Sequence, residues 1–161
     1  MAHEIYLKIN TDSNSTIEGE CFEQAHLGWI VLDDFSITIE GSTQDYRSSG
    51  GPELSPIGIN KHIDKASPKL ALATCMRSKF LKAQIDICQA SSNQASTRIF
   101  SMYLGGVIPV KYDLNGEDNS KDSFDLLYET IKFEYQQINP FTFDPGDKII
   151  THWTVLKSMG G

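Results

Sequence analysis

Four histidines and a few neighbouring carboxylates are the residues with the side chains for acid–base or metal chemistry. The histidines are far apart along the chain, at His3, His26, His62 and His152. Metal sites built from local ligands show short spacings such as HxxxH or CxxC, and neither spacing occurs here. We therefore expect no metal site, with a site assembled from distant ligands as the alternative. His26 and His62 are interpreted as edge or surface residues with ordinary partners.

Motifs for nucleophilic catalysis or nucleotide binding are also missing from the sequence. No GxSxG elbow, P-loop or dinucleotide glycine fingerprint is present, so we expect no catalytic residue and no cofactor. Asp33 and Asp34 are adjacent carboxylates, but neighbouring strand residues point to opposite faces unless the backbone bulges. His26 with Trp29 suggests a sugar-binding platform, although an anchoring core aromatic is the simpler interpretation.

The composition is that of one soluble globular domain with an acidic surface. The chain has 161 residues, of which 40% are hydrophobic and 22% are charged. Fourteen Lys and Arg against twenty-one Asp and Glu give a net charge of −7. Such a surface repels phosphate backbones, and the basic residues between positions 61 and 82 are spread out. We expect no basic patch and no nucleic-acid partner.

The N-terminal residues contain neither a basic segment nor a long apolar one, so we expect no secretory signal peptide. No stretch approaches the roughly 20 apolar residues that span a bilayer, and we predict no membrane insertion. The chain is therefore expected to be made in the cytoplasm. Its three cysteines, Cys21, Cys75 and Cys88, show no CxxC pairing and are interpreted as reduced, buried thiols.

The clearest strand signal spans residues 30–40. Apolar side chains share one face of its second half, at Phe35, Ile37 and Ile39. Their polar neighbours, which then point away from the core, are Asp34, Ser36 and Thr38. In the first half, Ile30 and Leu32 have the opposite parity. One extra residue would restore a single apolar face, so the pattern predicts a β-bulge at residues 33–34.

A single helix is predicted over residues 67–79. Ser67 is placed as the N-cap and Pro68 as the first helical residue, where its missing N–H costs nothing. Leu72, Cys75 and Met76 follow at helical spacing. Before this helix, residues 41–56 are rich in Gly, Ser and Pro and predict a long loop, of a length that is usually functional or disordered.

The remaining periodicity is that of strands. We predict them at residues 4–9, 57–63, 83–88, 97–104, 107–113, 127–135 and 148–157. The segments 97–104 and 107–113 are either two strands or one strand broken at Gly105 and Gly106. The expected fold class is mainly β, a barrel-like pair of packed antiparallel sheets with one flanking helix. Residues 1–161 are expected to form a single domain.

The segment KHIDKASPKL at residues 61–70 resembles the signature of the haemolysin-coregulated protein (Hcp) family. In that family a Tyr/His-Ile-Asp-Lys/Arg-x-Ser/Thr-Pro-x-Leu run opens the single helix. Other family landmarks follow in order, at residues 5–9, 19–20, His26, 30–36, 82–85, 134–135 and 152–153. The chain departs from the family at Phe35 (usually Trp), at residues 77–80 and at His152 (usually Gly). It is therefore identified as a divergent member.

This resemblance implies a non-catalytic tube subunit of the type VI secretion system. Six copies are expected to form a ring, and rings to stack into a tube inside a contractile sheath. The tube is expected to carry a VgrG-type spike, and small effector proteins are expected to travel in its lumen. The protein itself is expected to leave the cell through the machine, without a signal peptide. Ring assembly also suits a β-rich chain, because strand edges that would otherwise pair freely become the subunit interface.

The resemblance also assigns expected roles to residues. Asp34, Ser36 and Thr38 are expected to face the lumen, and the helix with neighbouring strand edges to lie at the subunit boundary. In the long loop, Tyr46, Arg47 and Pro52 are expected to contact the next ring. Two alternatives remain at this point: a β-barrel ligand- or sugar-binding module, expected to be a monomer, and an enzyme with a dispersed site.

Overall fold

The structure is a computed structural model that describes residues 3–41, 52–89, 97–117, 120–139, 141–142 and 144–155. Within these ranges the elements are β1 (His3–Asn10), η1 (Gln24–His26), β2 (Ile30–Leu32), β3 (Asp34–Ser36), β4 (Ile39–Glu40), β5 (Glu53–Leu54), β6 (Ile57–His62), α1 (Ser67–Met76), β7 (Phe80–Gln89), β8 (Thr97–Asn115), β9 (Lys121–Leu127), β10 (Thr130–Ile138) and β11 (Pro145–Thr154). The predicted mainly β class with one α-helix is confirmed.

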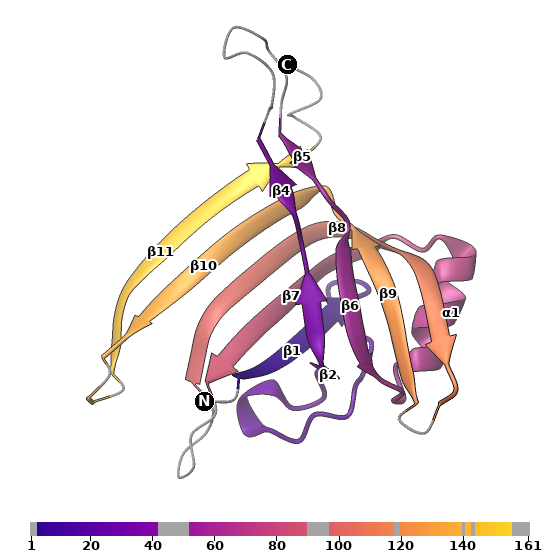
Figure 1. Ribbon diagram of the computed structural model, residues 1–161, viewed down its shortest axis with the longest axis horizontal. Helices are drawn as coiled ribbons and strands as arrows, with labels where there is room; N and C mark the ends of the chain where they lie inside the picture. The colour runs from indigo at the N-terminus through magenta and orange to yellow at the C-terminus, as the bar shows by residue number, and fades with distance from the viewer. Residues whose placement is uncertain are drawn as a thin grey trace, which may run out of the picture.

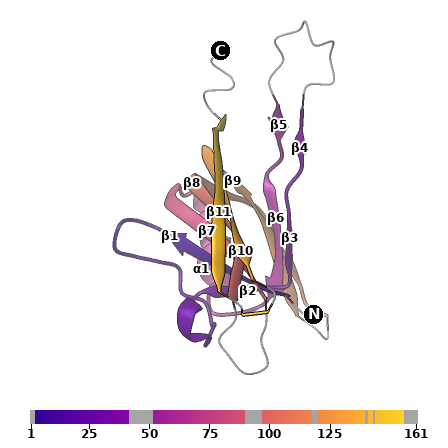
Figure 2. The same cartoon turned by 90° about the vertical axis from the view of Figure 1, so that its left-hand side faces the viewer.

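Two antiparallel sheets share the long strand β8. Sheet A has the order β2-β1-β7-β8-β10-β11, and sheet B has the order β3-β6-β9-β8. Figure 2 shows them as facing layers. The strand bends where it passes from one sheet to the other, at Gly106, whose φ of 58° lies in the left-handed region that glycine tolerates. Residues 97–113 therefore belong to one strand with a break in direction, which is one of the two expected arrangements.

The hydrophobic core lies between the sheets. It is built from alternate residues of each strand, among them Leu7, Ile85, Met102, Leu104, Ile131, Ile57, Ile59, Phe124 and Leu126. Burying each of these side chains stabilises the fold by about 1.5–3 kcal/mol. The helix α1 lies at the end of the molecule opposite β11 and adds Leu70 and Ala73 to the same core (Figure 1).

The helix is shorter than predicted and begins differently. Ser67 is its first residue rather than its N-cap, and Ala66 at the cap position contributes no side-chain hydrogen bond. At the other end, Arg77 adopts a left-handed conformation with φ 51° and ψ 44°. The Ser78 N–H then donates to the Ala73 carbonyl, which closes the helix at Met76. The predicted end at residue 79 is therefore wrong.

The predicted bulge at residues 33–34 is also wrong. The apolar parity changes because the chain leaves sheet A, where β2 pairs with β1, and enters sheet B, where β3 pairs with β6. Ile39 is not in the core. It lies in β4, which pairs only with β5, and 49% of its surface is exposed. Similarly, the single strand predicted at 127–135 is two strands, because β9 ends at Leu127 and β10 begins at Thr130.

The ribbon formed by β4 and β5 extends beyond the two sheets (Figures 1 and 2). Its base is fixed by Ser55, whose N–H donates to the Thr38 carbonyl over 2.9 Å. The predicted loop at 41–56 thus includes a short strand at its end. Tyr46 and Arg47 lie outside the described residues, whereas Pro52 is described and half-buried.

No helix in the described part of the chain is both long and apolar enough to cross a bilayer.

Candidate functional site

The helix-entry motif forms a buried polar cluster around Lys61, at the end of β6. Its ammonium has no exposed surface and lies 2.9 Å from Asp64 Oδ1 and 2.8 Å from Ser67 Oγ. From β9, Asp122 brings Oδ1 to 2.9 Å of the same ammonium. The Ser67 hydroxyl, which the sequence placed as a helix cap, instead accepts the Asp64 N–H over 3.0 Å. The motif therefore ties the start of α1 to sheet B.

A third strand, β8, completes this cluster. The Tyr112 hydroxyl on β8 donates to Asp122 Oδ2. Burial and this hydrogen bond raise the pKa of Tyr112 to about 12, so the phenol stays protonated at neutral pH. Lys61 pairs with both Asp64 and Asp122, so this one ammonium links β6, β9 and the turn before α1. Removing it would leave buried carboxylates without a counter-ion. The cluster therefore has a structural role.

A Cys–His–Asp combination is present around His26 but lacks the geometry of a catalytic triad. His26 Nε2 lies 2.8 Å from Asp86 Oδ2 and 3.8 Å from Cys88 Sγ. In a triad, one ring nitrogen faces the nucleophile and the other faces the carboxylate. Here the same nitrogen faces both, and the second nitrogen binds Glu23. Cys88 is also fully buried.

The protonation of His26 agrees with this geometry. Burial lowers the pKa of the imidazole, but its hydrogen bonds to Asp86, Cys88 and Glu23 outweigh that effect and raise the pKa to about 10. At neutral pH the ring is an imidazolium with both N–H groups engaged. It has no free nitrogen with which to accept a proton, so His26 cannot act as a general base.

His26 is only 4% exposed, so of the two expected positions, the edge of the core or the surface, the surface position is wrong. Tyr6 stacks on the ring at 4.5 Å between centroids, and Trp29 meets it edge-on at 4.6 Å. This packing favours the anchoring aromatic over the sugar platform for Trp29. His62 is exposed and pairs with Asp33 over 3.0 Å, as expected. Cys75, in contrast to the prediction, is exposed, while Cys21 and Cys88 are buried.

The residues assigned to the lumen share one exposed strip. Asp34 and Ser36 lie on β3 at the edge of sheet B, and Thr38 follows them; all three are exposed. Asp34 Oδ1 accepts the amide of Asn60 over 2.6 Å, which fixes its side chain along the strip. The structure therefore brings the three residues together, and their place in the lumen stays a prediction.

Sheet A has more strands than sheet B, and its strands β10 and β11 extend past sheet B in Figure 1. On the side that faces the core elsewhere, Tyr135, Ile149 and Trp153 remain 45%, 62% and 43% exposed. Tyr135 pairs directly with Ile149, and Trp153 lies four residues further along the same face of β11. We call these three residues the β11 patch. Sequence periodicity indicated the strand but could not show that sheet B ends before reaching it.

At the opposite end, α1 exposes a second apolar surface. Leu72 and Met76, one helical turn apart, are 59% and 67% exposed. We call these two residues the α1 patch. Exposed apolar side chains that lie next to one another can form part of a protein–protein contact. The two elements that carry these patches, β11 and α1, lie at opposite ends of the molecule in Figure 1.

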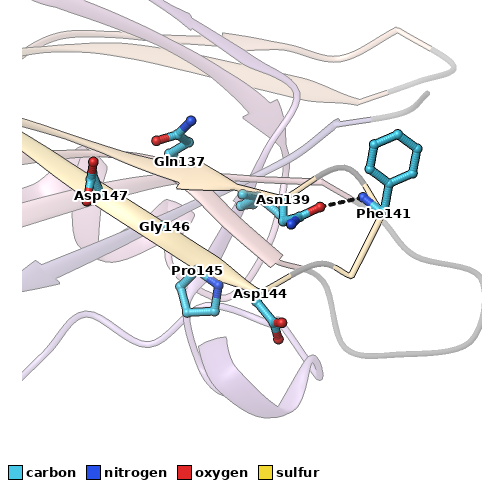
Figure 3. A pocket seen from close by; sticks show the side chains of 8 residues that line it. Gln137, Asn139, Phe141, Asp144, Pro145, Gly146 and Asp147 are labelled. Atoms are coloured by element: carbon cyan, nitrogen blue, oxygen red, sulfur yellow. Dashed lines mark hydrogen bonds between the residues drawn. The ribbon is translucent and has the colours of Figure 1, made fainter.

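A hollow of about 460 Å³ lies at the turn between β10 and β11. Figure 3 shows that the lining residues come from this one turn and the strand ends beside it, with the ring of Phe141 pointing away from the other labelled side chains. The Asn139 side chain accepts the Phe141 N–H over 2.9 Å and shapes the turn, and Phe141 is 90% exposed. Among the described residues that line the hollow, the titratable ones are Asp144 and Asp147. The turn is a candidate contact surface rather than a reaction site.

Across the described ranges, no three His, Cys, Asp or Glu side chains lie close enough together to hold a metal ion.

Comparisons with known proteins identify a family for this chain. The sequence profile of the family "Type VI secretion system effector, Hcp" matches residues 6–140. A comparison with curated protein sequences finds no match.

Solved structures similar to this one include a type six secretion system protein, with 22% identity, 98% of each chain covered and a TM-score of 0.83. Hcp1 from Salmonella typhimurium has 21% identity over 98% of this chain and 97% of its own, with a TM-score of 0.78. Hcp1 from E. coli EAEC 042 has 22% identity over 94% and 98%, with a TM-score of 0.76. At this identity they show a shared fold. Because the family profile covers most of the sequence, the chain belongs to the Hcp family of type VI secretion systems.

Proposed function

We propose that this protein is a structural ring subunit of the type VI tube, that six copies close into a ring, and that it acts without catalysis. The observation that carries the proposal is the pair of apolar surfaces at opposite ends of the molecule, the β11 patch and the α1 patch. A closed ring requires two different surfaces that meet head to tail. A twofold dimer would use one surface twice and leave the other exposed.

The edge strand β11 supports the same arrangement. Apart from Thr154, every residue of β11 is exposed, and among the strands that the structure describes it pairs only with β10. An open edge of ten residues would pair with any available strand unless a defined partner covered it. In the proposed ring, the side of a neighbouring subunit that bears α1 covers β11 and its patch.

The remaining parts of the proposal follow from family membership. Rings stack into a tube within a contractile sheath, the tube meets a VgrG-type spike, and small effector proteins travel in the lumen. The protein is made in the cytoplasm and leaves the cell with the machine. The exposed strip at Asp34, Ser36 and Thr38 is the proposed lumen wall, and the loop with Tyr46, Arg47 and Pro52 is the proposed contact between rings.

Electron microscopy of the purified protein tests the ring directly. We expect end-on views with six-fold symmetry and a central opening. Class averages with a twofold dimer or a compact monomer would contradict the proposal. A monomer that also bound a sugar or another small ligand would favour the binding-module alternative.

A further inference from the structure

A hollow of about 340 Å³ lies on the face of sheet A that points away from the core. Its polar lining comes from four neighbouring strands and consists of Lys8, Asn10, Lys82, Tyr103, Thr130 and Lys132, with the amide of Gln84 beside them. No carboxylate lines it. The prediction that the chain has no basic patch is wrong, because Lys8 on β1, Lys82 on β7 and Lys132 on β10 line the same hollow.

The strand register explains why these residues meet. One row across the sheet runs from Lys8 through Gln84 and Tyr103 to Lys132. In the adjacent row, Gly105 pairs with Lys82 on one side and with Thr130 on the other. A Cβ at Gly105 would lie 2.3 Å from Thr130 Oγ1, so the absence of a side chain opens the hollow.

The charges of the three lysines are not compensated within the described residues. None of them forms an ion pair there. The acids in the next row of the sheet already have partners, and Glu129, beside Thr130, pairs with Lys79. Asp86 binds His26, and Glu134 lies within 3.3 Å of Arg98 and 3.6 Å of Lys148. A positive hollow therefore persists on a chain whose net charge is −7.

Two of these ammonium groups are held in place by aromatic rings. Lys132 Nζ lies 4.8 Å from the centroid of the Tyr103 ring, and Lys8 Nζ lies 5.8 Å from that of Trp29. A cation–π contact orients an ammonium but leaves its positive charge in place. Less side-chain freedom is then lost when an anion binds, which favours binding at this position.

The geometry points to an acidic polypeptide segment as the ligand: we propose that this hollow binds an extended strand of a partner protein through alternate carboxylates. Lys8 and Lys132 stand three strand spacings apart, roughly 14 Å, so one oxyanion cannot engage both. Alternate side chains of an extended peptide are about 7 Å apart on one side, which places successive carboxylates among the three lysines. A nucleic acid is disfavoured, because its phosphates would also meet the acidic remainder of the surface. The inference does not depend on the ring.

A binding experiment with the full chain tests the proposal. The probe is a fluorescent peptide of alternating Glu and Ser, measured by fluorescence anisotropy at low salt. The test variant is Lys8→Gln/Lys82→Gln/Lys132→Gln. The matched control is Lys65→Gln/Lys69→Gln/Lys111→Gln, which also removes three lysine charges, but at exposed positions outside the hollow. Thermal unfolding of both variants establishes that each remains folded.

We expect the unchanged protein and the control variant to bind the peptide with equal affinity. The test variant should bind it about tenfold more weakly, as expected for the loss of three partly screened charge contacts. A peptide with Gln in place of Glu should not bind.

The proposal is overturned if the unchanged protein fails to bind, or if both triple variants lose affinity equally. It is also overturned if tripolyphosphate or a single-stranded DNA oligonucleotide binds more tightly than the peptide and loses affinity in the test variant alone. In that case the hollow recognises phosphate.

Discussion

The ammonium of Lys61 and the carboxylate of Asp122 lie 2.9 Å apart, and neither side chain has any exposed surface. They are 61 residues apart in the sequence and belong to the neighbouring strands β6 and β9. Asp64 and Ser67 bind the same ammonium from the turn that leads into α1. One buried cation thus connects sheet B with the only α-helix of the described chain, and this explains the spacing of the family motif around it.

Replacing this cation should destabilise the fold strongly. In Lys61→Met, Asp122 and Asp64 keep their buried carboxylates without a counter-ion. Removing one partner of a buried ion pair costs about 3–5 kcal/mol. Urea unfolding at one fixed protein concentration should show a loss of this size in the free energy of unfolding.

The exposed Lys65 provides the control, since Lys65→Met should change that free energy by no more than about 0.5 kcal/mol. Adding Asp122→Leu to Lys61→Met should restore part of the stability, because it removes one of the unpaired carboxylates. Equal effects of Lys61→Met and Lys65→Met would show that the cluster contributes nothing.

Stability should fall as the pH rises from neutral to alkaline values, because of His26. The pKa of the imidazole is about 10 in the folded protein, against an ordinary value of 6.5. Below pH 6.5 both states are protonated and the full contribution is present. Between these values only the folded state holds the proton, so the free energy of unfolding should drop by up to about 1.4 kcal/mol per pH unit.

His26→Gln isolates this effect. The variant should be less stable than the unchanged protein at pH 6, and the difference should shrink steadily toward pH 10. Unfolding measured across this range checks the sign as well as the size, and the difference between the two proteins cancels the titration of Tyr and Cys residues. A difference that stays constant with pH would mean that His26 carries no extra proton.

The exposed strip on β3 should line the lumen of the ring. A gold label on Ser36→Cys, introduced into a Cys75→Ser background because Cys75 is exposed, should appear inside the ring by electron microscopy. Ser36→Arg should leave particle mass unchanged and alter the retention of cargo. Gold density around the outer rim would place β3 on the outside and refute the assignment.

The loop beyond β4 and β5 should mediate contact between rings. Replacing residues 43–51 by a brief Gly/Ser turn keeps both strands of the ribbon, since β5 begins at Glu53. We expect rings of unchanged mass that no longer stack and are no longer exported. A milder variant, Tyr46→Ser with Arg47→Ser, should weaken stacking if these side chains make the contact. Normal tubes from the shortened protein would identify the loop as a tolerated insertion.

Local patterns in the sequence predicted the fold class but missed where strands change partners. Alternation identified Ile30 and Leu32, then Phe35 and Ile37, as apolar pairs of opposite parity. A bulge and a passage between two sheets leave the same local pattern, and only pairing with β1 or β6 separates them. Ile39 shows the same limit, because periodicity cannot tell a strand over the core from one in a projecting ribbon.

The surfaces were less predictable than the core, because they depend on register across the sheet. Lys8, Lys82 and Lys132 have no common spacing in the sequence, and they meet because β1, β7, β8 and β10 align their rows. The burial of Lys61 was also not predictable from the sequence. No local pattern indicated that its side chain is buried, and the partners that make complete burial possible include Asp122 from a distant strand.

Particle mass in solution tests the central claim most directly. Light scattering coupled to size exclusion, at micromolar concentration, should give about six times the 18.0 kDa mass of the chain. Ile149→Asp, which places a charge in the β11 patch, should shift the particle toward monomer. His152→Ala, on the opposite face of the same strand, serves as the control and should retain the ring. A monomer from the unchanged protein across this concentration range would contradict the account.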